Sequence, residues 1–178
     1  MIEMPYSEFF TLLHEDTITL SEDIKVLPKK TQIRDKIYYS LKSNLNPTSF
    51  SGTLDGNGHT IYNPPDMLFS EILEDGIVKD VTISGCDHNS MAVVCETNRG
   101  YIENVTVDRD SSSESGKLSG GLVKDNKGVI TECFFEASIE SEESVGGISG
   151  INSGKVSDCS MSGDIHSHFE SGGICGVN

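Results

Sequence analysis

Four polar residues, three of them acidic, recur along the chain at a spacing that could place them side by side. Each lies four positions after a glycine of a repeated pattern: Asp80, Asn104, Glu132 and Asp158. If the repeats stack as neighbouring strands, equivalent residues lie roughly 5 Å apart. Carboxylates at that separation could bind Ca²⁺, or Glu132 and Asp158 could supply the pair of a retaining glycosidase. The simpler interpretation is a solvated acidic face. Asp80, Glu132 and Asp158 are therefore candidates for cation binding, and no catalytic residue is assigned.

Two other groups resemble metal ligands but are better explained by local structure. The segment Asp55-Gly56-Asn57-Gly58 starts like a calcium loop, but His59 and Thr60 follow where an EF-hand needs an oxygen ligand and a glycine. Asp-Gly and Asn-Gly are typical of tight turns. His166 and His168 would share one face of a strand, yet no third ligand for a metal is identified. The sequence therefore predicts no metal site in these segments.

The five cysteines are odd in number and contain no Cys-x-x-Cys pair, which argues against a disulfide scaffold and a zinc module. Cys133 and Cys159 occupy the same position of successive repeats, and Cys95 and Cys175 share another. Apolar residues alternate with them at matched positions, which favours packing in a core over metal or redox chemistry. No Gly-x-Ser-x-Gly motif indicates a nucleophilic serine.

The charge of the chain limits its partners. Asp and Glu number 28 against 13 Lys and Arg, which gives a formal net charge of −15. This acidity argues against nucleic acid and anionic membranes as partners. No stretch approaches the roughly 20 apolar residues of a membrane-spanning helix. The first ten residues have no signal-peptide pattern, which indicates either a cytosolic protein or a segment of a larger one.

An internal repeat of about 26 residues organises the chain from Gly76 onward. Its clearest marker is a series of asparagines at intervals of 28, 26 and 26 positions: Asn98, Asn126, Asn152 and Asn178. Apolar residues recur at fixed offsets from each repeat's glycine, with the alternation typical of strands. The period is too short for a propeller blade and lacks the spacing of leucine-rich repeats. It predicts an all-β fold, a parallel β-helix in which these asparagines form an internal amide ladder at a turn.

The N-terminal region differs from the repeats. Apolar residues at 9, 10, 12 and 13 follow Pro5, which predicts a helix over about 5–14, and the alternation after Thr17 predicts strands. A helix laid across the open end of a β-helix covers its core and its unpaired strand edge. We therefore expect an N-terminal cap over 1–30 and β-helix repeats over 31–178.

A glycine-rich segment gives the sequence a resemblance to a known family. It reads Phe50-Ser51-Gly52-Thr53-Leu54-Asp55-Gly56-Asn57-Gly58-His59-Thr60-Ile61, and later units read Gly-Gly-Leu/Ile-x-x-x-Asn-x-Gly-x-Ile/Val. Together they resemble the GLUG-repeat β-helices of bacterial and archaeal surface proteins. The resemblance implies a right-handed parallel β-helix of the pectin lyase-like kind, outside the cell or on its surface, that acts as a stalk or adhesive surface without catalytic residues or cofactor. The Gly76 unit departs from the pattern, with Glu74 where later units have asparagine.

We therefore expect a non-catalytic structural or adhesive module of a larger cell-surface protein, with a glycan or protein as its ligand, no nucleic acid partner and no insertion into a membrane. The alternatives are a carbohydrate-active β-helix, either lyase or hydrolase, and a Ca²⁺-dependent binding module, because the fold alone does not supply the function. The last repeat stops at Asn178 without a capping element. Since solenoids need caps, this predicts a truncated chain or end-to-end association through that coil.

Overall fold

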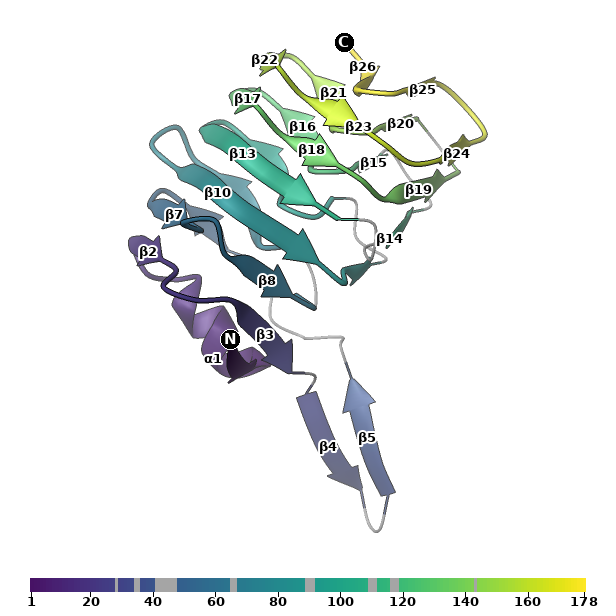
Figure 1. The fold of residues 1–178 in the computed structure, drawn as a ribbon. Helices are drawn as coiled ribbons and strands as arrows, with labels where there is room; N and C mark the ends of the chain where they lie inside the picture. Colours follow the sequence, from purple (N-terminus) through teal and green to yellow (C-terminus); the bar gives the residue numbers. More distant parts are fainter. Residues whose placement is uncertain are drawn as a thin grey trace.

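The predicted parallel β-helix is confirmed by the computed structural model, in which short strands wind into coils stacked along one axis (Figure 1). The structure describes residues 1–27, 29–33, 36–40, 48–64, 67–88, 92–108, 112–115, 119–142 and 144–178. Every strand pair between coils is parallel and in register, so equivalent residues of successive repeats lie next to each other. Among the described residues, no helix is long and apolar enough to cross a membrane.

Within the residues that the structure describes, the coils build four parallel sheets. The largest contains β1 (Ile2–Pro5), β2 (Thr17–Thr19), β3 (Ile24–Leu27), β7 (Thr53–Asp55), β8 (Thr60–Tyr62), β10 (Ile77–Ser84), β13 (Tyr101–Val107), β17 (Val129–Thr131), β18 (Phe134–Phe135), β22 (Lys155–Ser157) and β23 (Ser160–Met161). A second contains β6 (Ser49–Phe50), β9 (Phe69–Ile72), β12 (Cys95–Asn98), β16 (Val123–Asn126), β21 (Ser149–Asn152) and β26 (Cys175–Val177). The third contains β11 (Asp87–His88), β14 (Ser112–Ser115), β19 (Ser138–Ser141) and β24 (Ile165–Ser167), and the fourth β15 (Ser119–Gly120), β20 (Val145–Gly146) and β25 (Ser171–Gly172).

The core is a set of apolar columns that run along the axis. The offsets found in the sequence place one such column at Val78, Ile102 and Ile130, all fully buried, and Val156 of the last coil is partly buried. Burial of a side chain of this size contributes about 1.5–3 kcal/mol to stability. Because each coil supplies a few such residues, the narrow core explains how a chain with only 35% apolar residues folds.

The N-terminal helix is shorter than predicted. Helix α1 spans Tyr6–Leu12, and it buries Phe9 at the same end of the molecule as β2 and β3 (Figure 1). Strands β2 and β3 pair with β7 and β8, so they already belong to the largest sheet. The domain boundary at residue 30 stays a prediction, and it falls inside the strand Lys29–Ile33.

One feature departs from the coil path. Strands β4 (Lys29–Ile33) and β5 (Lys36–Ser40) form an antiparallel hairpin that extends away from the stacked coils (Figure 1). The sequence analysis placed this segment among the repeats. The periodicity that supported the repeats begins only at Gly76, so it could not locate an excursion before that point.

Candidate functional site

The asparagine series forms a hydrogen-bonded ladder at the end of the second sheet. Each side-chain amide donates from Nδ2 to Oδ1 of the next asparagine: Asn98 to Asn126 at 2.8 Å, Asn126 to Asn152 at 2.8 Å, and Asn152 to Asn178 at 2.7 Å. Asn98 and Asn126 are fully buried. Oδ1 of Asn98 also accepts the backbone N–H of Gly100 at 3.1 Å, which ties the side chain to the following turn. The oxygen and the nitrogen of each buried amide thus have a hydrogen-bond partner within the protein.

The ladder ends on an apolar residue toward the N-terminus. Asn98 pairs in register with Ile72, whereas Glu74 lies two residues later, in the turn before Gly76. The alignment of Glu74 with the asparagines, made by counting back from Gly76, is therefore wrong, because the turn after Ile72 is longer than the turn after Asn98.

The acidic column consists of Asp80, Asn104, Glu132 and Asp158, which occupy equivalent positions of successive coils. It lies at a corner of the largest sheet, where the backbone is left-handed. The φ angles are +52° at Asp80, +49° at Asn104, +55° at Glu132 and +54° at Asp158. Asn and Asp enter this region more easily than most residues, which explains the types found at three of the four positions. The recurrence therefore has a backbone cause in addition to any role of the side chains.

Two members of this column contact each other. Asn104 donates from Nδ2 to Oδ1 of Asp80 at 2.8 Å, and Nζ of Lys79 lies 3.5 Å from the other oxygen of Asp80. Within the described residues, no group of three or more His, Cys, Asp and Glu side chains is arranged to hold a metal ion. Cation binding by Asp80, Glu132 and Asp158 stays a prediction.

The glycine-rich segment at Asp55 forms a tight turn. Asn57 and Gly58 have φ angles of +50° and +80°, and the backbone N–H of His59 donates to the carbonyl of Gly56 at 2.8 Å. The carboxylate of Asp55 accepts the N–H of Asn57 at 2.8 Å and lies 2.8 Å from Nζ of Lys79. The hydrogen bond from Lys79, followed by the one from Asn57, lowers the pKa of Asp55. This carboxylate thus closes a turn and joins two coils.

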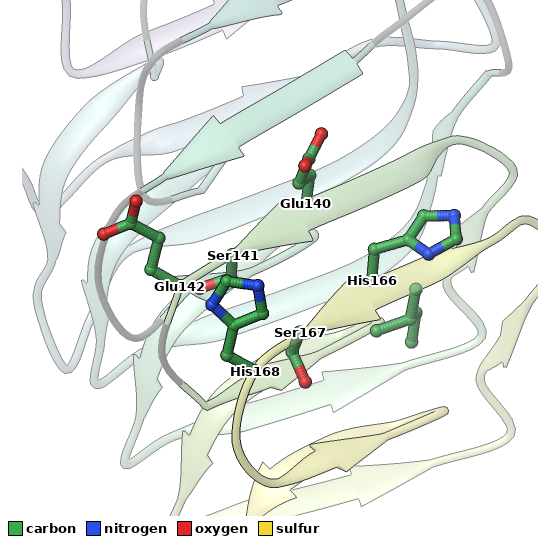
Figure 2. A pocket seen from close by; sticks show the side chains of 7 residues that line it. Glu140, Ser141, Glu142, His166, Ser167 and His168 are labelled. Atoms are coloured by element: carbon green, nitrogen blue, oxygen red, sulfur yellow. The ribbon is translucent and has the colours of Figure 1, made fainter.

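A pocket of about 380 Å³ lies on the outer face of β19 and β24. Ile139 is buried while Glu140 is exposed, because side chains alternate across a strand. Glu140 pairs in register with His166, and Glu142 and His168 come directly after the next pair, Ser141 and Ser167. Figure 2 shows these carboxylates and imidazoles projecting from the two neighbouring segments. The pocket therefore presents two carboxylates and two imidazoles on one open face.

This arrangement suits a polar, hydroxyl-rich ligand. Carboxylate oxygens accept hydrogen bonds from hydroxyl groups, and an imidazole can donate from one nitrogen while it accepts at the other. All four side chains are exposed, so a ligand could reach them without displacing core residues. The pocket is the best candidate for a binding site among the described residues.

The sequence pattern indicated half of this pocket. His166 and His168 were identified as a pair on one strand face, but Glu140 and Glu142 were not connected with them. The signal was present, because each glutamate lies 26 residues before one of the histidines. Applying the repeat period to the histidines would have brought the four residues together.

No family model matches the sequence, and no curated protein or solved structure matches it either. The pocket and the ladder are therefore interpreted from their own geometry.

Proposed function

We propose that this chain is a non-catalytic structural and adhesive β-helix module of a larger cell-surface protein. The observation that carries the proposal is that polar side chains on its surface join each coil to the next. Such contacts, between residues 24 to 28 positions apart, include Arg99 with Glu71 at 2.7 Å, Lys124 with Glu96 at 2.8 Å, Asn104 with Asp80 at 2.8 Å and Thr131 with Ser157 at 3.1 Å.

The direction of these contacts supports a mechanical role, in which the stack of coils resists being pulled apart along its axis. A single exposed ion pair contributes only about 0–1 kcal/mol. Here the pairs run along the solenoid axis, parallel to the amide ladder and to the stacked core, so they oppose separation of coils. The acidic surface, with a net charge of −15, favours solubility of this extended stack. The resemblance to GLUG-repeat β-helices supports the location at the cell surface.

The adhesive part of the proposal is placed at the outer pocket of Glu140, Glu142, His166 and His168. We take a glycan as its ligand class because the pocket offers acceptors and donors on an exposed face. A rigid stack would hold this face at a distance from the point where the protein is anchored. It would thereby present the pocket to a glycan.

A glycan array tests the adhesive role. The purified chain is expected to bind at least one glycan class, and the double variant Glu140→Gln with His166→Gln is expected to lose tenfold or more in affinity. Asp158→Asn, which removes an exposed charge on another sheet, is the matched control and is expected to bind like the wild type. Equal binding by the double variant would contradict the pocket as the site, and the absence of any bound glycan would contradict the glycan ligand.

The pair of carboxylates in the pocket also supports a second candidate, a carbohydrate-active enzyme. Glu140 and Glu142 lie beside two imidazoles, and hydrolases use carboxyl groups as acid and base. Incubation of the bound glycans with the protein separates the two candidates. Intact glycan after prolonged incubation supports the adhesive module, whereas shortened products that disappear with Glu142→Gln support the enzyme.

A further inference from the structure

Two reduced cysteines lie in successive coils at equivalent positions. Thr131 pairs with Ser157, and Phe134 pairs with Ser160, so Cys133 and Cys159 are neighbours across the same pair of coils. Neighbouring strands are about 4.8 Å apart, which falls within the 4.4–6.8 Å range that a disulfide requires between Cα atoms. The Cα spacing therefore permits a direct bond, which forms once the two thiols leave their present hydrogen bonds and turn toward each other.

The two side chains also point in the same direction. Sγ of Cys133 donates to the carbonyl of Thr131 at 3.1 Å, and Sγ of Cys159 donates to the carbonyl of Ser157 at the same distance. Each sulfur also lies 3.9 Å from a carbonyl of the preceding coil, Ile102 for Cys133 and Ile130 for Cys159. The identical surroundings follow from the repeat and align the two thiols along the axis.

We propose that Cys133 and Cys159 form a site of reversible oxidation, at which a small-molecule disulfide converts the two thiols into a covalent link between adjacent coils. The inference is independent of the adhesive role, because it rests only on the stacking of the coils. It assigns a chemical function to a pair that the repeat pattern alone explains as core packing.

Exposure distinguishes the attacking thiol from the resolving thiol. Cys133 is fully buried, whereas Cys159 is partly exposed. The neighbouring Cys133 thiol lowers the pKa of Cys159, whereas Cys159 and burial raise the pKa of Cys133. The thiolate is the nucleophile in disulfide exchange. Cys159 is therefore the residue that reacts first.

The exchange proceeds in two balanced steps. The Cys159 thiolate attacks one sulfur of the small disulfide, forms a mixed disulfide and releases one small thiolate. Cys133 then attacks Sγ of Cys159 and passes its proton to the departing small thiolate, which leaves as the second small thiol. The two protein thiols lose two electrons and two protons, and the small disulfide is reduced to two thiols.

Cys175 is the competing partner and supplies the control. It is partly buried, and this burial, followed by the charge of Cys159, raises its pKa. Its neighbour in register is Ser149, so the equivalent position of the preceding coil holds no cysteine. Cys175→Ser therefore removes the competing thiol and leaves the proposed pair.

The test is oxidation of the full chain with oxidised glutathione, followed by peptide mapping without reduction. We expect a link between Cys133 and Cys159, formed equally in Cys175→Ser. We expect persistent glutathione adducts on Cys159 in Cys133→Ala. A link between Cys159 and Cys175, or a glutathione adduct that persists on Cys159 in the wild type, would overturn the proposal.

A second measurement guards against variants that fold poorly. Oxidation of the wild type is expected to raise its melting temperature by about 5–10 °C, because the bond restricts the unfolded chain. Cys133→Ala, compared with itself before and after the same treatment, is expected to show no such rise. An equal rise in Cys133→Ala would assign the stabilisation to another pair and contradict the inference.

Discussion

A buried side-chain amide destabilises a protein unless its oxygen and nitrogen both find partners. Asn126 meets this requirement with copies of itself, because it accepts from Asn98 and donates to Asn152. The asparagines of the coils on both sides therefore require at position 126 a side chain that both accepts and donates a hydrogen bond. Asn178 accepts from Asn152 but is exposed, so water can serve its remaining groups.

Replacement of Asn126 by leucine is expected to cost about 2–3 kcal/mol in the free energy of unfolding. The change leaves the Nδ2 of buried Asn98 and the Oδ1 of partly buried Asn152 without their ladder partner; the loss at the buried group costs about 1–3 kcal/mol, and the loss at Asn152, which water can reach, costs less. Chemical denaturation measures the difference. Asn178→Leu is the control at the exposed end of the ladder and is expected to change stability by less than about 1 kcal/mol. A similar loss in both variants would show that the buried amides are not special.

The spacing of the asparagines was sufficient to predict this ladder. A buried amide in each coil requires an amide partner in the next coil, so asparagine recurs at the period of the repeat. The left-handed corner at Asp80 and Glu132 was not predicted. Acidic residues at a fixed interval fit both a solvated strand face and a turn, and only the φ angles distinguish them. Glutamate has no strong preference for the left-handed conformation, so Glu132 in particular gave no indication of a corner at this position.

At the scale of the strand and its turn, the paired glycines show how closely the coils approach. A Cβ on Gly121 would overlap the carbonyl oxygen of Gly147 and the ring of Phe135. Gly147 meets the carbonyl of Gly173 in the same way, whereas a Cβ on Gly173 would meet nothing within 4 Å. Close contact between coils, and not a positive φ angle, is what requires glycine at Gly121.

Gly121→Ala is expected to destabilise the protein by about 1–3 kcal/mol, the usual cost of adding a methyl group to a tightly packed site. Gly173→Ala, the same change in the same column, is expected to have almost no effect, because the space beside it is open. Thermal or chemical unfolding of the two variants gives the comparison. If the two alanines were equally harmful, conformational preference would be the cause and not the contact between coils.

The elements of the repeats were predictable because strand alternation and period agree over several copies. The path before Gly76 was harder to predict. The hairpin of β4 and β5 has no second copy, so no repeated column marks it. The helix was placed correctly but ends at Leu12, before the predicted residue 14, because the N–H groups of His14 and Glu15 donate to carbonyls only three residues earlier, which turns the chain.

As a whole, the molecule is a one-dimensional stack in which each coil contacts only its neighbours. Its interior is uneven along the axis. Ile102 and Ile130 of the middle coils are fully buried, while Val156 and Ile174 of the last described coil are only partly buried. Local stability should therefore fall toward that coil.

Hydrogen exchange followed by mass spectrometry checks this expectation. Backbone amides of 95–107 are expected to exchange at least tenfold more slowly than those of 155–161, because the side chains of 155–161 are less buried. Peptides of 123–131 provide an intermediate reference. Uniform exchange along the chain would contradict local opening and would indicate a single cooperative unit.

The in-register ladder also constrains how a gene for such a protein can change in length. Asn126 and Asn152 are 26 residues apart and bonded to each other, so removal of one whole repeat would join equivalent positions and preserve every column. Removal of a single residue within a strand would shift the later side chains of that strand to the opposite face. Recombination between repeats would therefore be tolerated far better than deletions within strands, whereas the turns, which already differ in length between coils, can absorb small changes.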